Sequence, residues 1–250
     1  MMGNRVVVAN WKMNLSRKEG LALTDAIVKG IVGVKNVTTI LAVPFPFLAE
    51  VGERIANVPN LHLAAQNCSN EENGAFTGEI SAQMLKSFGV EYVLVGHSER
   101  RLYFGERGLL LCRKMEVAIA HGLTPIFCCG EDSTDRKNKK QFPVVKRQLA
   151  TAALLMSEKD FSQILIAYEP VWAIGTGQTA TAVQAEEMHE HIHQVIYSRF
   201  TTVANRIPIL YGGSVKPSNA AELFNQPHIH GALVGGASLI ADDFLSIVKA

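Results

Sequence analysis

A glutamate at the end of an apolar stretch is the first residue of this sequence that could do chemistry. Ile164 to Tyr168 has the composition of a short buried strand, and Glu169 follows it directly. Pro170 then prevents further strand pairing. The apolar residues Val171 to Ile174 come next, before two glycines, a pattern typical of a lid. We predict that Glu169 is a general base that becomes more basic as lid closure removes its solvent. The alternative is an ordinary connection with a solvated glutamate.

Two further side chains follow predicted strands and could act on a carbonyl group. His97 precedes Ser98 to Arg100, which resembles a short helical turn, and the positive end of a helix favours a neutral imidazole that can donate to a carbonyl. Lys12, with Asn10 beside it, could place a cation near a phosphate and a developing oxyanion. Glu99 is predicted to pair with Lys12 or to anchor the turn. The alternatives are a satisfied polar histidine and a surface lysine.

Glycines near predicted strand ends could bind a phosphate through backbone N–H groups, with no side chain in the way. They are Gly175 in the lid, Gly212 and Gly213 before Ser214, and Gly235 and Gly236 before Ser238. None belongs to a Walker loop or a dinucleotide fingerprint, so neither a nucleoside triphosphate nor NAD is indicated. We expect no organic cofactor.

Two other patterns resemble reactive sites but are better explained as ordinary residues of a helix and a strand. The sequence H-E-H-I-H, from His189 to His193, matches a zinc-protease motif literally, but it should lie far along the helix that follows Glu169. A solvated helical face is the better interpretation of this segment, and we expect no metal in this protein. Cys128 and Cys129 are predicted to be buried strand residues rather than nucleophiles, because no histidine accompanies them in a motif.

Eight apolar stretches alternate with helix-like segments and must position these side chains. They are rich in Val, Ile and Leu without strict alternation, which is typical of parallel strands covered by helices. The stretches are Val6 to Ala9, Val37 to Val43, Leu61 to Ala65, Tyr92 to Val95, Pro125 to Cys129, Ile164 to Tyr168, Ile207 to Tyr211 and Ala232 to Val234. Polar residues follow them repeatedly, which places the site at the carboxyl ends of the strands. We predict an α/β fold in which residues 1–250 form a single-domain (β/α)8 barrel, with eight parallel strands inside a ring of helices.

Six segments, in the same order, resemble the triosephosphate isomerase family and span essentially the whole chain. They are N-W-K-M-N at Asn10 to Asn14, G-A-F-T-G-E at Gly74 to Glu79, G-H-S-E-R-R at Gly96 to Arg101, A-Y-E-P-V-W-A-I-G-T-G-Q-T-A at Ala167 to Ala180, Y-G-G-S-V at Tyr211 to Val215 and L-V-G-G-A-S-L at Leu233 to Leu239. The resemblance implies an isomerase of glycolysis and gluconeogenesis that interconverts dihydroxyacetone phosphate and D-glyceraldehyde 3-phosphate through an enediolate. It also implies that Glu169 and a neutral His97 act as a pair.

The connection from Gln66 to Gly78 is long and has an apolar tip, which usually indicates a contact with a partner. The resemblance implies a homodimer in which this loop, with Phe76 and Thr77, docks into a second identical subunit. The alternative is a loop that folds onto its own barrel.

A few residues depart from the family pattern. Gln178 stands where the far end of the lid often has lysine, and Cys129 replaces an aliphatic residue. His230 occupies a position that is commonly aspartate, so we expect Arg206 to lack a counter-charge there. None of these changes involves the proposed chemistry, and we expect the activity to be kept.

Composition limits the class of protein further. A chain of 250 residues that is 48% hydrophobic can bury one large core, and a formal net charge of +1 does not suggest a nucleic-acid partner. Four cysteines without C-x-x-C spacing, and no apolar signal segment, indicate a cytoplasmic protein. No apolar run approaches the roughly 18 residues of a membrane span, so no membrane association is expected.

The residues by themselves support a phosphosugar enzyme on a barrel, whereas the identity of the substrate comes from the resemblance. Two alternatives stay open. One is a barrel enzyme that acts on another sugar phosphate, and the other is a catalytically silent barrel that binds a phosphosugar.

Overall fold

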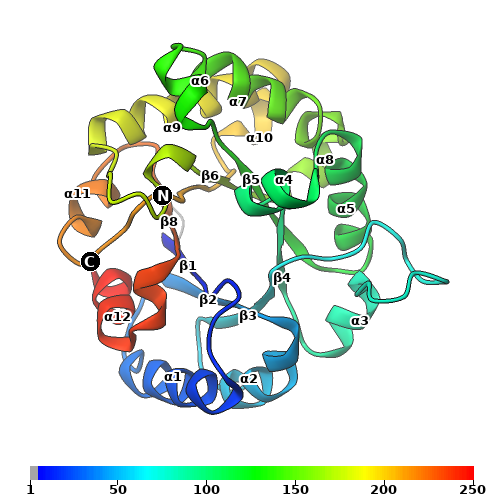
Figure 1. Ribbon diagram of the computed structural model, residues 1–250, viewed down its shortest axis with the longest axis vertical. Coiled ribbons are helices and arrows are strands. Elements are labelled where there is room, and N and C mark those ends of the chain that lie inside the picture. Colours follow the sequence, from blue (N-terminus) through cyan, green and yellow to red (C-terminus); the bar gives the residue numbers. More distant parts are fainter. Residues whose placement is uncertain (1–4) are drawn as a thin grey trace.

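The computed structural model describes residues 5–250, which form a closed barrel of eight parallel strands in sequence order (Figure 1). The strands are β1 (Arg5–Asn10), β2 (Val37–Val43), β3 (Leu61–Ala65), β4 (Tyr92–Val95), β5 (Thr124–Cys129), β6 (Leu165–Tyr168), β7 (Ile209–Tyr211) and β8 (Gly231–Val234). The predicted fold is confirmed, and each predicted strand is present with ends that coincide or differ by one or two residues. The predicted start of the domain, at residue 1, lies outside the described residues.

The helices form a ring around the barrel (Figure 1). They are α1 (Arg17–Gly30), α2 (Leu48–Ile55), α3 (Ala82–Ser87), α4 (Ser98–Phe104), α5 (Leu109–Ala120), α6 (Ser133–Lys137), α7 (Gln141–Ala150), α8 (Glu158–Phe161), α9 (Ala182–Arg199), α10 (Thr201–Ala204), α11 (Ala220–Phe224) and α12 (Ala241–Lys249). Their starts are specified locally. Ser16 and Thr181, for example, begin α1 and α9 with complete capping boxes, which satisfy otherwise unpaired backbone N–H groups.

The strands are apolar on both faces because each face is buried against a different set of side chains. Alternate residues such as Val8, Ile40 and Leu210 fill the interior of the barrel. Their neighbours, such as Val7 and Leu41, pack outward against the helices in a larger core. This two-sided burial explains the nearly continuous apolar runs of the sequence.

Cys128 and Cys129 show the same alternation, since Cys128 lies in the interior cluster and Cys129 in the outer one. Both are buried, which confirms their prediction as barrel residues. Burial also raises the pKa of the Cys129 thiol to about 12, so this thiol is protonated at neutral pH.

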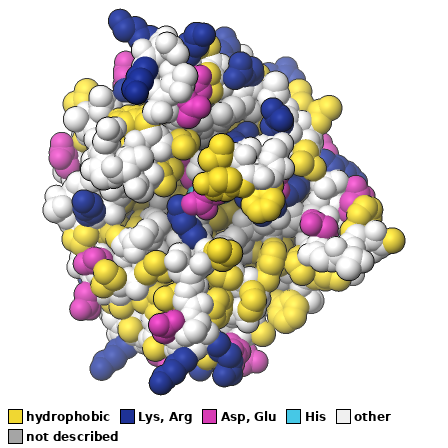
Figure 2. Space-filling model, in the orientation of Figure 1, with side chains coloured by type: hydrophobic (Ala, Val, Ile, Leu, Met, Phe, Trp, Pro, Cys, Tyr) yellow, Lys and Arg dark blue, Asp and Glu magenta, His cyan; other side chains and the backbone are white. Residues whose placement is uncertain are grey.

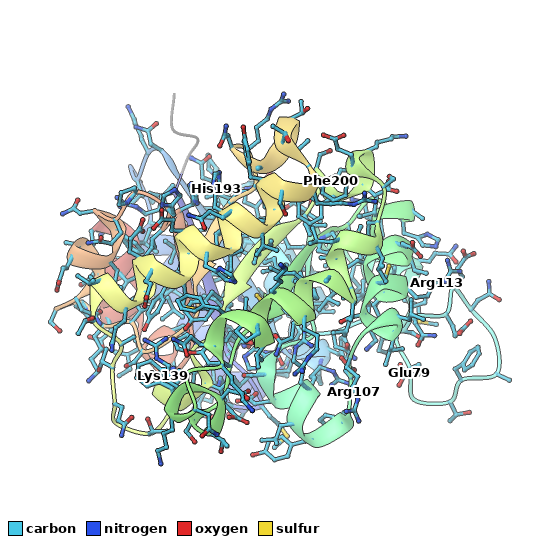
Figure 3. All side chains as sticks on the ribbon, turned by 90° about the horizontal axis from the view of Figure 1, so that it is seen from above. Glu79, Arg107, Arg113, Lys139, His193 and Phe200 are labelled. Carbon is cyan, nitrogen blue, oxygen red and sulfur yellow. The ribbon has the colours of Figure 1, made fainter. Side chains whose placement is uncertain are left out.

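The connection between β3 and α3 projects from the side of the barrel (Figures 1 and 3). Phe76 and Thr77 are exposed near its tip, so within one subunit the loop does not fold back onto the barrel. Of the helices in the described part of the chain, none is long and apolar enough to cross a membrane.

Candidate active site

Glu169 lies directly after β6 and is almost completely buried, with 1% of its surface exposed. Its backbone N–H donates to the Cys129 carbonyl at 2.7 Å, so its main chain continues the pairing between β5 and β6. Gly130 is required beside it, because a Cβ atom there would lie 1.7 Å from the Glu169 carbonyl oxygen. The strand end therefore holds this carboxylate in a closely packed position.

The Glu169 carboxylate is turned toward the start of α4. It accepts hydrogen bonds from the Ser98 backbone N–H at 2.8 Å and from the Ser98 hydroxyl at 3.3 Å. The His97 Nε2 atom lies 2.9 Å from Glu169 Oε1. Nothing in the sequence identified Ser98 as a partner of Glu169, because the two residues are far apart in the chain and meet only where β4 and β6 end.

His97 is the N-cap residue of α4, and its Nδ1 atom accepts the Glu99 backbone N–H at 3.3 Å. An accepting Nδ1 places the ring proton on Nε2, which then donates to Glu169. The helix start therefore selects the tautomer that can donate from Nε2, as a carbonyl-polarising group requires.

The pKa values of this pair shift against the directions expected from the sequence. Burial by itself would raise the pKa of Glu169, but the charge and hydrogen bond of His97, the Ser98 N–H group and Lys12 outweigh it and lower that pKa. Burial would likewise lower the pKa of His97, and the Glu169 and Glu99 carboxylates reverse this shift and raise it. These directions hold while the two groups contact each other, whereas the more basic glutamate and the neutral histidine are expected once the lid closes and the contact is broken.

Lys12 has a left-handed backbone, with φ of 52°, which is unfavourable for a residue with a side chain. Two side chains hold it there. Asn10 Oδ1 accepts the Lys12 N–H at 3.0 Å, and Gln66 Nε2 donates to the Lys12 carbonyl at 2.9 Å. The Lys12 ammonium pairs with Glu99 at 2.6 Å, so Glu99 has both of the contacts considered for it. The contact of Gln66 with Lys12 was not predicted from the sequence.

The proposed side chains meet at a cavity of about 630 Å³ at the carboxyl ends of the strands. Figure 2 shows this face of the molecule, hollowed near the centre, with basic and acidic side chains next to each other there. The predicted residues that line the cavity are Asn10, Lys12, His97, Glu169, Gly175, Ser214, Gly235 and Gly236. The lining also includes Asn14, Lys216 and Leu233, which sequence analysis did not select.

Close packing explains the glycines at the end of β7. A Cβ atom on Gly212 would lie 3.0 Å from Glu169 Cγ, and one on Gly213 would lie 2.2 Å from the Tyr211 hydroxyl. Gly235 faces Lys12 from β8, since its Cβ would be 3.5 Å from Lys12 Cε. The predicted glycines therefore bring bare backbone to the cavity, and Gly235 does so next to the lysine.

The predicted lid begins as one turn of 3-10 helix at Val171–Ala173 and continues as an exposed loop. Glu131, after β5, accepts hydrogen bonds from the Trp172 indole at 2.8 Å and from the Tyr168 hydroxyl at 3.0 Å. Burial raises the pKa of Glu131 although these hydrogen bonds oppose the shift. The first part of the lid is thus anchored to the barrel, while Ile174 and Gly175 reach the cavity.

The histidines of the H-E-H-I-H segment have structural contacts. The expectation of a solvated helical face is wrong for His189, which is fully buried and packs against Tyr168 and Tyr211. Figure 3 shows His193 on the side opposite to Arg107 and Lys139, which belong to loops at the carboxyl ends of the strands. His189 Nδ1 donates to the His228 carbonyl at 3.0 Å, and His193 Nε2 contacts Asn205 at 2.8 Å. Among residues 5–250, no group of three potential ligands is arranged to hold a metal ion.

His230 lies in the turn directly before β8. Its Nδ1 atom accepts the Ile209 N–H at 3.1 Å. Burial lowers its pKa, and the charges that act on it most are those of His228, His193 and Glu186. His228 in turn contacts Glu186 at 2.6 Å. The charges that act on His230 most are therefore those of histidines and a glutamate, because the turn before β8 faces α9.

His189 should make the protein less stable in acid. It is fully buried, its Nε2 atom has no hydrogen-bond partner among the described residues, and burial lowers its pKa from 6.5 to about 3. Below pH 6.5 the His189 imidazole is therefore protonated in the unfolded chain but stays neutral in the folded chain. At about pH 5 this difference lowers the free energy of unfolding by roughly 2 kcal/mol. The free energy falls further as the pH approaches the pKa of about 3 in the folded protein.

Urea unfolding of the parent and of His189→Gln, which keeps a donor for the His228 carbonyl, measures this effect. The parent should lose about 2 kcal/mol more than the variant between about pH 7 and pH 5. An equal loss in both proteins would mean that His189 is not the titrating group.

The sequence is similar to known proteins over its whole described length. The sequence model of the family described as "Triosephosphate isomerase" matches residues 5–250. The chain is 47% identical to triosephosphate isomerase of Porphyromonas gingivalis over the whole of both chains. It is 46% identical to that of Bacteroides fragilis, over 100% of this chain and 99% of the relative, and 45% identical to that of Flavobacterium psychrophilum, over 99% of each.

Proposed function

Because the chain belongs to the triosephosphate isomerase family, we propose that Glu169, His97 and Lys12 carry out its reaction. That reaction is the interconversion of dihydroxyacetone phosphate and D-glyceraldehyde 3-phosphate. The observation that carries the proposal is the convergence of a buried carboxylate, an Nε2–H donor and an ammonium group on one cavity rimmed by bare backbone. Each group comes from a different strand end, so the arrangement depends on the closed barrel.

Glu169 is the base in this proposal. Its carboxylate swings from Ser98 and His97 into the cavity, takes a proton from one of the two adjacent substrate carbons and returns it to the other. The swing removes the two contacts that contribute most to lowering its pKa, while burial remains. The carboxylate therefore becomes more basic as it reaches the substrate.

His97 and Lys12 stabilise the charge that this proton transfer creates. The His97 Nε2–H group donates to the carbonyl oxygen that becomes negative in the enediolate, while Nδ1 keeps its bond from the Glu99 N–H. Once Glu169 has turned away, the carboxylate that raises the pKa of His97 is gone and the neutral ring is favoured. The Lys12 ammonium, supported by Asn10 and Glu99, adds a fixed positive charge.

The phosphate group is bound in this proposal by Gly175 of the lid, by Ser214 after β7, and by Gly235 and Gly236 after β8. Bare backbone at these positions lets N–H groups approach phosphate oxygens closely. The nearby Lys12 supplies the compensating charge. Binding at this end leaves the carbon atoms of the substrate toward Glu169 and His97.

A coupled assay of triose phosphate isomerisation with the purified chain tests this assignment. Aldose phosphates with longer carbon chains are the matched controls. Turnover of the triose phosphates only is expected, and equal turnover of a longer aldose phosphate would favour another sugar phosphate as the substrate.

A homodimer is the assembly that we propose. Large apolar side chains are exposed after β1 and on α4, among them Met13 at 96%, Leu102 at 70% and Tyr103 at 73%. Figure 2 shows hydrophobic side chains gathered between the barrel mouth and the projecting loop. A patch of this kind supports a protein contact, with Phe76 and Thr77 inserted into the second subunit.

Thr77→Arg should therefore give monomers with impaired activity, because the change places an unpaired charge in a packed subunit contact. Analytical ultracentrifugation with an activity assay measures both effects. Thr201→Arg, at an exposed threonine of α10, is the matched control and should leave the dimer intact. A tight dimer of Thr77→Arg would show that this loop is not the contact.

We also propose that the enzyme is cytoplasmic and consists of a single domain. The four cysteines are free and buried, which supports a reducing cytoplasm. The continuity of the barrel from β1 to β8 supports residues 1–250 as one domain.

A further inference from the structure

We infer that Arg101 is a positioning residue that sets the spacing between His97 and Glu169. It lies in the last turn of α4, and its partly buried guanidinium reaches back across the start of that helix. The inference deepens the proposed function, since it rests on the roles given there to His97 and Glu169.

Arg101 joins two backbone segments at the point where strand pairing stops. The ladder between β4 and β5 ends at the pair Val95 and Phe127. One residue beyond that pair, Arg101 Nε donates to the Gly96 carbonyl at 2.7 Å and Nη2 donates to the Cys128 carbonyl at 2.7 Å. Figure 1 shows α4 beside the ends of these two strands. The guanidinium therefore continues the connection between β4 and β5 after their own hydrogen bonds have ended.

The two segments that Arg101 joins lead directly to the proposed catalytic side chains. Gly96 immediately precedes His97, and Cys128 precedes Cys129, whose carbonyl accepts the Glu169 N–H at 2.7 Å. The positions of His97 and Glu169 are thus linked through Gly96, Arg101 and β5. A shift of either carbonyl would change the distance between the imidazole and the carboxylate.

The packing at this place favours arginine over other cations. Gly96 has φ of 72°, and a Cβ atom there would lie 2.8 Å from Leu111 Cδ1 and 3.1 Å from Arg101 Nη2. The guanidinium carbon also lies 5.4 Å from the centre of the Phe127 ring. A planar guanidinium holds its Nε–H and Nη2–H donors in fixed directions toward the two carbonyls, whereas an ammonium group is a compact charge whose donors are not held in such a fork.

Arg101→Lys keeps the positive charge and removes the fork. Its kcat for triose phosphate isomerisation should fall about tenfold to 10²-fold, the effect expected when reacting groups are misplaced by up to about 1 Å. KM and the inhibition constant of inorganic phosphate should stay unchanged, because the proposed phosphate groups lie after β6, β7 and β8. Arg107→Ala is the matched control, since this exposed arginine lines the same 860 Å³ cavity as Arg101. It should keep the parent kcat.

Chemical rescue separates positioning from a loss of fold. In Arg101→Ala, added ethylguanidine can enter through that cavity and should raise kcat, whereas ethylammonium should not. Unchanged kcat in Arg101→Lys, or no greater effect of ethylguanidine on Arg101→Ala than on the parent, would overturn the inference. An inactive parent protein would instead mean that the proposed function is wrong, so the two failures are distinguishable.

Discussion

Glu169→Gln should lower kcat by at least about 10²-fold to 10⁴-fold, while a phosphate ligand still binds nearly as well as it does to the parent. Glutamine has almost the shape of glutamate, and its amide oxygen can still accept the Ser98 N–H hydrogen bond. It cannot take a proton from carbon. The loss should therefore appear in kcat and not in binding.

Steady-state kinetics and direct titration with inorganic phosphate measure the two quantities separately. Glu190→Gln, at an exposed glutamate of α9, is the matched control and should behave as the parent does. Full turnover in Glu169→Gln would remove Glu169 from the mechanism.

Deleting Ile174 to Gly177 should raise the loss of phosphate from the enediolate relative to isomerisation. Gly175 to Gly177 are exposed, Ile174 is partly buried, and Ile174 and Gly175 reach the cavity. Without them water reaches the enediolate, and no backbone N–H from the lid holds the phosphate oxygens. The anchored turn should survive, because Trp172 remains hydrogen-bonded to Glu131.

The ratio of inorganic phosphate released to isomerised product, followed in one reaction mixture, tests the lid. Gln178→Lys changes the far end of the loop without shortening it, and its ratio should match that of the parent. A deletion variant with the parent ratio would show that the loop does not protect the intermediate.

The local pattern of the sequence was sufficient for the strands and for the buried carboxylate. Apolar runs of three to seven residues, most of which end at a polar residue or glycine, specify buried parallel strands and their carboxyl ends. Glu169, His97 and Lys12 were each found as polar residues that follow such runs. Closure of eight units then brings them to one cavity, which is a general property of this barrel.

Contacts between segments that are far apart in the chain could not be predicted from the sequence. The hydrogen bonds from Ser98 to Glu169 and from Gln66 to Lys12 depend on which way each side chain turns after its strand ends. The charged groups that act on His230 depend on how α9 packs against the turn before β8, which the sequence does not show.

The sequence by itself determined the barrel, the strand ends and the residue types at the mouth, because burial and chain direction act along every strand in the same way. Only the tertiary structure decided the pKa directions of Glu169 and His97. Desolvation can be inferred from an apolar sequence, but the opposing effect of a charge 2.9 Å away depends on a side-chain rotation. At that distance in a buried site the partner charge outweighs the loss of solvent, so geometry sets the sign of the shift.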